Sequence, residues 1–325
     1  MRPNLSKGVD WRNPTMKILI AYDGSDCAEA ALDDLQRAGL PREAEAVILS
    51  VADVYPLPPS SQEEKPPQTV FERQIAAARE KAHTHAIQAL DKARTFAVQA
   101  SIRVQASFPA WRVSAEACVD SPAWGIIKKA DDWDADLIVM GAHSGSAVSR
   151  MLLGSVSQKV LHESGRTVRI ARGRVVEATA PVRLIVGVDG SPDADTAIGT
   201  IAERVWRPGS EVRVVVVLDA TLLAAALDWI SERQTTIPTA VQTMAEAAAE
   251  KLRAAGLSAN VVSREGDPKH VLLEEAERWD ADAIFLGAHG LRRLERLLLG
   301  SVATAVAARA MCSVEIVRGK LEKRG

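Results

Sequence analysis

The chain repeats itself, and this repeat constrains the fold more than any other feature of the sequence. Residues 132–160 read DWDADLIVMGAHSGSAVSRMLLGSVSQKV, and residues 278–306 read RWDADAIFLGAHGLRRLERLLLGSVATAV. Two shorter pairs accompany the long one: ILIAYDGS (18–25) is answered by LIVGVDGS (184–191), and TVRIAR (167–172) by SVEIVR (313–318). A repeat of this extent predicts two copies of one structural unit.

The length of the chain agrees with this division, because 325 residues suit two domains of about 150 residues each. We call residues 16–172 copy one and residues 182–318 copy two. The expected organisation is an N-terminal extension (1–15), copy one, a linker (173–181), copy two and a C-terminal tail (319–325).

Copy one is longer than copy two between its motifs. Asp189 lies 166 residues after Asp23, whereas Gly287 lies only 146 residues after Gly141. Copy one therefore holds about 20 extra residues, counted from these two offsets. We expect them in the Pro- and Ser-rich segment 56–67, which is typical of a loop, and in the Ala-rich stretch 71–107.

Within each copy, short β-branched runs alternate with longer helical patterns, which indicates βα units on a parallel sheet. The expected fold class is α/β, with two tandem doubly wound domains that each have a five-stranded parallel sheet flanked by helices. The predicted strands are 17–22, 45–52, 113–118, 136–140 and 167–172 in copy one, and 183–188, 211–218, 259–263, 282–286 and 313–318 in copy two. A helix is expected from Thr239 to Ala255, and Ser25 and Ser191 are expected to cap the helices that follow the first strands.

The last strand of each copy is expected to close its sheet and to leave an edge that needs a partner. A short linker lets the two edges pair within one chain. This predicts a pseudo-dimer inside one chain. Whether whole chains also form a homodimer is left open.

The bulk composition restricts the class of partner. The chain has 40 Lys and Arg against 42 Asp and Glu, which gives no electrostatic footprint for nucleic acid or an anionic membrane. No apolar run approaches the length of a membrane span. Three scattered cysteines, Cys27, Cys118 and Cys312, favour the reducing cytoplasm over a disulfide framework.

The chemistry-bearing feature of copy two is Gly287-Ala-His-Gly290, followed after nine residues by Gly300-Ser301. Glycines let the backbone approach a ligand, and a helix N-terminus offers free N–H groups to phosphate oxygens. In a parallel sheet, the ends of the strands before Asp189 and Gly287 should meet at the ligand crevice. Spacing alone leaves a second interpretation open, in which the glycines only make tight turns.

The Asp-Gly-Ser after the first strand, together with Gly-x2-Gly-x9-Gly-Ser after the fourth, resembles the universal stress protein family. The resemblance covers nearly the whole chain and implies an ATP site in which the Asp contacts adenine and the glycine motif wraps ribose and phosphates. Because single-domain members pair their closing strands antiparallel in a dimer, the resemblance also implies that Val168 and Ile170 face Val314 and Ile316 within this chain. Any Mg²⁺ would arrive with the nucleotide. The implied ATP-binding residues of copy two are Val188, Asp189, Val217, Leu286, Gly287, His289, Gly290, Gly300, Ser301 and Val302; those of copy one are Asp23, Gly141, Gly154 and Ser155.

Copy one departs from the pattern of that family. Ser144 stands where copy two has Gly290, and Asp120-Ser121-Pro122 stands where copy two has Gly-Asp-Pro. A side chain at position 144 could block a phosphate, although Gly145 could compensate. We therefore expect copy two to hold the nucleotide and leave open whether copy one also does.

Other candidate groups receive weaker interpretations. His143 and His289 share one motif position without a nucleophile or a paired base in the sequence, so a structural role is favoured over catalysis. Arg150 and Arg296 correspond, and they could pair with phosphates or lie on a solvated face. No acidic cluster forms a recognisable metal set, so neither catalytic nor metal-binding residues are assigned.

The leading hypothesis is a cytoplasmic ATP-binding regulatory protein of the stress response. It is expected to act as a binding protein rather than as an enzyme. Two alternatives stay open: a slow ATPase, which would need an activated water, and an interaction module that functions without nucleotide. The sequence does not identify a protein partner.

Overall fold

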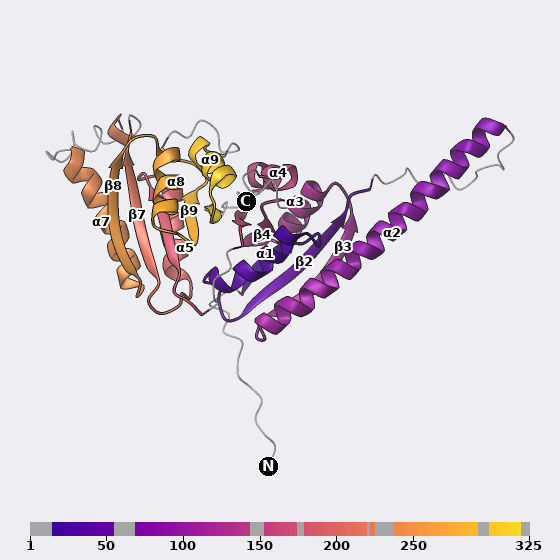
Figure 1. Cartoon of the computed structure of the whole chain (residues 1–325), viewed down its shortest axis with the longest axis horizontal. Coiled ribbons are helices and arrows are strands. Elements are labelled where there is room, and N and C mark those ends of the chain that lie inside the picture. Colours follow the sequence, from indigo (N-terminus) through magenta and orange to yellow (C-terminus); the bar gives the residue numbers. More distant parts are fainter. Residues whose placement is uncertain are drawn as a thin grey trace, which may run out of the picture.

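The computed structural model describes residues 15–54, 69–143, 153–173, 179–219, 222–224, 237–291 and 299–319. Both copies fold as layers of helices around strands, and the strands of the two copies meet in the middle of the molecule (Figure 1).

The elements of copy one follow the expected alternation. They are β1 (Met16–Ala21), α1 (Asp26–Asp34), η1 (Leu35–Arg37), β2 (Ala44–Ala52), α2 (Val70–Ser107), β3 (Arg112–Val119), α3 (Pro122–Asp132), β4 (Leu137–Gly141), α4 (Ser155–Glu163) and β5 (Thr167–Ala171).

Copy two repeats this order. Its elements are β6 (Arg183–Val188), α5 (Pro192–Glu203), β7 (Glu211–Leu218), α7 (Ile237–Ala254), β8 (Ser258–Glu265), α8 (Pro268–Arg278), β9 (Ala283–Gly287), α9 (Ser301–Arg309) and β10 (Ser313–Val317). All ten predicted strands are present, with ends that differ by at most two residues from the expected ones.

Local sequence explains where the first helix of each copy begins. Ser25 and Ser191 have extended backbone and accept from the amides of Ala28 and Ala194, each at 3.2 Å, as predicted for N-caps. The turn before each cap holds a glycine with positive φ, Gly24 at 78° and Gly190 at 81°, a conformation that favours glycine.

The ten strands form one sheet in the order β3-β2-β1-β4-β5-β10-β9-β6-β7-β8. Every neighbouring pair is parallel except β5 and β10, which run antiparallel where the copies meet. In this register Val314 faces Ile170 and Ile316 faces Val168. The intrachain pairing of the two closing strands is therefore confirmed, and we call this junction the seam.

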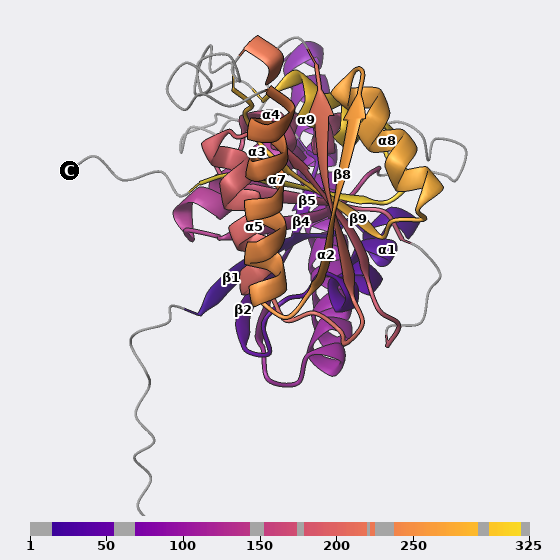
Figure 2. The same cartoon turned by 90° about the vertical axis from the view of Figure 1, so that its left-hand side faces the viewer.

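Helices cover both faces of the sheet, and Figure 2 shows α5 and α7 on one side of the copy-two strands with α8 on the other. On the face of α3, α4, α8 and α9 the apolar core is continuous across the seam, since Val168, Ile170, Val314 and Ile316 all belong to one buried cluster. On the opposite face the core is divided into one cluster per copy.

On that second face the seam carries charged side chains. Successive strand residues point to opposite sides of a sheet, so Arg169 and Glu315 point away from the apolar face of the seam. Arg169 and Glu315 are direct partners in the β5–β10 register, and both side chains are buried, with 1% and 0% exposed. Arg169 donates to Asp34 at 2.5 and 3.0 Å and to Glu315 at 3.2 Å. Arg204 donates to Glu315 at 2.9 Å and to the carbonyl of Ala38 at 2.8 Å. We call Asp34, Arg169, Glu315 and Arg204 the seam ionic chain.

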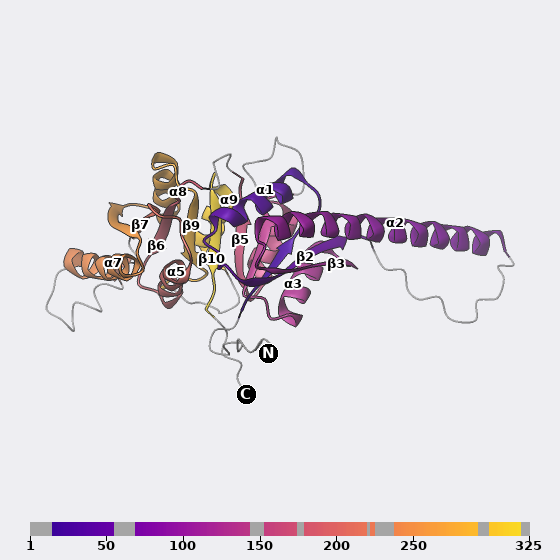
Figure 3. The same ribbon diagram turned by 90° about the horizontal axis from the view of Figure 1, so that it is seen from below.

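The Ala-rich stretch of copy one is one helix. Helix α2 has 38 residues, whereas its counterpart α7 has 18, and Figure 3 shows α2 running well beyond the strands that it covers. Its buried residues, Ala93, Ala97, Ala100 and Val104, all lie in its C-terminal part. The difference in length accounts for the predicted insertion, while segment 56–67 lies outside the described residues.

In the described ranges, no helix combines the length and the apolar character that crossing a bilayer requires.

Candidate functional site

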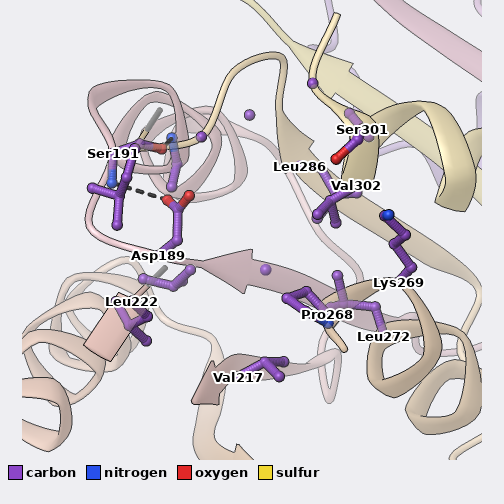
Figure 4. A pocket seen from close by; sticks show the side chains of 18 of the residues that line it. Asp189, Ser191, Val217, Leu222, Pro268, Lys269, Leu272, Leu286, Ser301 and Val302 are labelled. Atoms are coloured by element: carbon purple, nitrogen blue, oxygen red, sulfur yellow. Dashed lines mark hydrogen bonds between the residues drawn. The ribbon is translucent and has the colours of Figure 1, made fainter. Parts of the chain in front are cut away.

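A cavity of about 300 Å³ opens at the carboxyl ends of β6, β7 and β9 in copy two. Strands β7 and β9 lie on either side of β6, so the cavity sits where the strand order reverses, which is where ligands bind in open α/β sheets. Figure 4 shows Asp189 and Ser191 at one end of the cavity and Ser301 and Val302 at the other, with Leu286 between them.

The turn after β6 fixes the carboxylate of Asp189. One carboxylate oxygen accepts from the amide of Ser191 at 2.9 Å, and Ser191 in turn donates from its hydroxyl to the carbonyl of His289 at 3.2 Å. The first and fourth strands of copy two are thus joined by side-chain hydrogen bonds at their carboxyl ends. The second oxygen of Asp189 lies beside Gly290.

The glycines of the motif lie at close contacts. A Cβ at Gly287 would lie 2.6 Å from the carbonyl carbon of Asp193, and a Cβ at Gly290 would lie 2.8 Å from the Oδ2 of Asp189. A Cβ at Gly300 would lie 3.1 Å from the carbonyl oxygen of Ala288, which accepts from the amide of Gly300 at 2.8 Å. Each glycine therefore allows a close approach of backbone or side chain that a larger residue would disturb.

Helix α9 points its N-terminus at the cavity. Its N-cap is Gly300, which has no side chain to accept from the first-turn amides, and Ser301, Val302 and Ala303 all line the cavity. Uncapped amides and the positive end of the helix dipole favour an anion at this position.

His289 is held by a carboxylate that the sequence did not reveal. Its Nδ1 lies 2.7 Å from Oδ2 of Asp193, and the same oxygen accepts from the His289 backbone amide at 3.1 Å. The Nε2 atom is buried and has no hydrogen-bond partner in the described part of the chain. The sequence interpretation that no base accompanies this histidine was incomplete, because Asp193 lies 96 residues away from it along the chain.

All ten residues predicted for copy two line this cavity. The structure adds lining residues that were not assigned to the site from the sequence: Ser191, Asp219, Leu222, Asp267, Pro268, Lys269 and Leu272. Gly266-Asp267-Pro268 is a recognisable turn in the sequence and could have pointed to Lys269, whereas Asp219 and Leu222 have no motif around them. The assignment of these residues to a nucleotide stays a prediction.

Comparison with known proteins decides the family. The model of the universal stress protein family matches residues 14–172 and again residues 182–318. The chain belongs to the universal stress protein family.

Relatives and solved structures agree with this membership. A universal stress protein of Mycolicibacterium smegmatis is 27% identical over 187 residues, and one of Mycobacterium tuberculosis is 28% identical over 197 residues. Each match covers 57% of this chain and 62% of the relative, less than two thirds of its length. A universal stress protein from Archaeoglobus fulgidus has the same fold, with a TM-score of 0.60 over 94% of this chain and 99% of that chain at 22% identity.

Copy one keeps part of the arrangement found in copy two. Asp23 accepts from the amide of Ser25 at 3.0 Å, and Gly154, the N-cap of α4, donates from its amide to the carbonyl of Ala142 at 2.8 Å before the helix begins at Ser155. A Cβ at Gly141 would lie 2.6 Å from the carbonyl oxygen of Cys27. The four predicted residues of copy one thus occupy positions equivalent to those of copy two.

Two further differences between the copies lie around the turn after the first strand and the motif histidine. Phe96 of α2 lies so close to Gly24, in the turn that carries Asp23, that a Cβ on this glycine would be 2.6 Å from the ring. Cys27 occupies the repeat position of Asp193, so His143 has no carboxylate from that position. Burial, followed by the charge of Arg172, lowers the pKa of His143.

Several sequence candidates lie outside the described residues, among them Ser144, Gly145, Arg150 and Arg296. Within the described ranges, no group of three or more His, Cys, Asp or Glu side chains is placed to hold a metal ion.

Proposed function

We propose that this universal stress protein is an ATP-binding regulatory protein whose nucleotide is held mainly by copy two. The proposal rests on two features that line the same cavity. One is the fixed carboxylate of Asp189, and the other is the uncapped N-terminus of α9 at Gly300 and Ser301.

The two ends of the cavity suit the two ends of an adenine nucleotide. The free oxygen of Asp189 offers an acceptor for the exocyclic amine of adenine, and Val217, Leu222 and Leu286 offer apolar contacts for the ring. The amides of α9 offer donors for phosphate oxygens. Figure 4 shows Asp189 at one end of the cavity and Ser301, the first residue of α9, at the other, as a nucleotide requires.

We propose binding as the function, with nucleotide occupancy biasing the conformation or the partner choice of the tandem in the stress response of the cytoplasm. The described lining of the cavity favours ATP binding over ATP hydrolysis. The candidate bases of the described lining are His289, whose Nε2 is buried, and three aspartates. Asp189, Asp219 and Asp267 each already accept from a backbone amide of their own turn. Hydrolysis would require a group that activates water.

Mass spectrometry of small molecules released from the purified full-length protein tests the proposal. We expect ATP or ADP at close to one molecule per chain. Calorimetric titration of nucleotide-free protein with ATP gives the affinity, and phosphate release under the same conditions measures turnover. A protein that neither carries nor binds an adenine nucleotide would refute the proposal, and rapid phosphate release would favour the ATPase alternative.

A further inference from the structure

Lys269 lies in the cavity of copy two at a position that none of the family motifs above includes. It is the second residue of α8, after Pro268, and its backbone amide donates to the N-cap carboxylate of Asp267 at 3.0 Å. The side chain is half-buried. Figure 4 shows it extending along the cavity, so that its ammonium end lies nearest Val302 and Ser301, at the N-terminus of α9.

The surroundings of Lys269 leave its charge available. Within the described part of the chain, its Nζ has no hydrogen-bond or ion-pair partner. The three carboxylates that line the cavity each accept from a backbone amide of their own turn: Asp189 from Ser191, Asp219 from Leu222 and Asp267 from Lys269. Lys269 is the one lysine or arginine among the described lining residues.

A half-buried ammonium beside uncapped helix amides favours an anion with several acceptor oxygens. Both features attract negative charge, and both lie at the same end of the cavity. A phosphate chain provides such oxygens, whereas the purine and ribose of a nucleoside carry no negative charge.

Copy one lacks this cation. Pro122 corresponds to Pro268 in the repeat, and the next residue is Ala123, which is buried against the copy-one core. The two copies therefore differ at this position in charge, in addition to the difference at Ser144.

We propose that Lys269 binds the phosphate chain of the nucleotide and makes copy two selective for nucleoside di- and triphosphates over adenosine. This inference rests on the proposed function and deepens it, because it assigns the charge that distinguishes a polyphosphate from a nucleoside at the same site.

Calorimetric titrations of the full-length protein with ATP and with adenosine, in one magnesium-containing buffer, test the role of Lys269. We expect Lys269→Met to weaken ATP about 10- to 100-fold, the range for loss of a charge-assisted hydrogen bond. Adenosine affinity should change less than about twofold, because a neutral ligand gains little from the ammonium. Lys269→Arg should retain most of the ATP affinity.

Lys251→Met is the matched control, because Lys251 is an exposed lysine on α7 and its loss should leave both affinities unchanged. Equal losses for ATP and adenosine in Lys269→Met would show a merely structural role and overturn the assignment. Unchanged ATP affinity in Lys269→Met, with ATP binding by the wild type, would overturn this inference alone. A wild type that binds neither ligand would overturn the proposed function and this inference with it.

Discussion

The seam ionic chain should make Glu315 one of the most sensitive positions of the chain. Its side chain is fully buried and accepts from both Arg169 and Arg204. Burial acts to lower the pKa of Arg169, but the carboxylates of Asp34 and Glu315 outweigh this effect and hold the pKa above its ordinary value. Arg169 therefore stays charged. Within the described residues, Glu315→Ala would leave Arg169 with the carboxylate of Asp34 and would leave the buried guanidinium of Arg204 with no carboxylate partner.

The magnitude follows from this burial. Removing one partner of a buried ion pair costs about 3–5 kcal/mol, because the remaining charge is uncompensated. A domain is typically stabilised by about 5–15 kcal/mol, so this loss is a large fraction of the total. The exposed pair between Glu274 and Arg278, with 65% and 54% of the side chains exposed, provides the control. Glu274→Ala should cost less than about 1 kcal/mol.

Equilibrium urea unfolding of the full-length variants measures both losses, followed by tryptophan fluorescence and by far-UV circular dichroism. The two probes must give the same transition before it is converted to a free energy. The double variant Arg169→Met/Glu315→Leu should lose less than the sum of its single variants, because it removes both charges of the direct pair. Additive losses, or a Glu315→Ala variant that is as stable as Glu274→Ala, would refute the reasoning.

Three further predictions concern the nucleotide sites. Gly290→Val should abolish ATP binding with an unchanged circular dichroism spectrum, because the new side chain would meet Oδ2 of Asp189; unchanged affinity by calorimetry would contradict the site. Asp189→Ala should weaken ATP about 10-fold or more while tripolyphosphate binding changes little, and equal losses would argue against a contact with adenine. Ser144→Gly should raise the nucleotide stoichiometry or the affinity of copy one, and no change would direct attention to Phe96 and to the insertion.

The backbone of this chain could be predicted from the sequence to a large extent. The alternation of β-branched runs and helical patterns located all ten strands, and the family resemblance gave the antiparallel pairing of Val168 and Ile170 with Ile316 and Val314. The ten residues assigned to copy two line one cavity, because parallel strands bring their carboxyl ends to the same edge. Periodicity and topology, together with the family resemblance, suffice for predictions of this kind.

Side-chain partners across elements could not be predicted in the same way. Asp193 reaches His289, and Phe96 packs on Gly24, through the relative placement of helices over the sheet. The pair of Arg169 and Glu315 depends on the register of two strands that lie 146 residues apart. No local pattern fixes such contacts, since helix and strand periods give only the face on which a residue lies.

The repeat and the seam together explain why the two copies belong in one chain. Arg169 and Glu315 occupy the same position of the repeat, so a symmetric pair of identical strands would place two buried like charges opposite each other. Other seam contacts are equivalent in both copies: Arg172 donates to the carbonyl of Ala307 at 2.6 Å, and Arg318 to that of Leu161 at 2.9 Å. The symmetric contacts fix the geometry of the pairing, and the opposite charges select unlike copies for it. Because Ala307 lies in the last turn of α9, an arginine of copy one holds one end of the nine-residue helix whose other end lines the cavity of copy two.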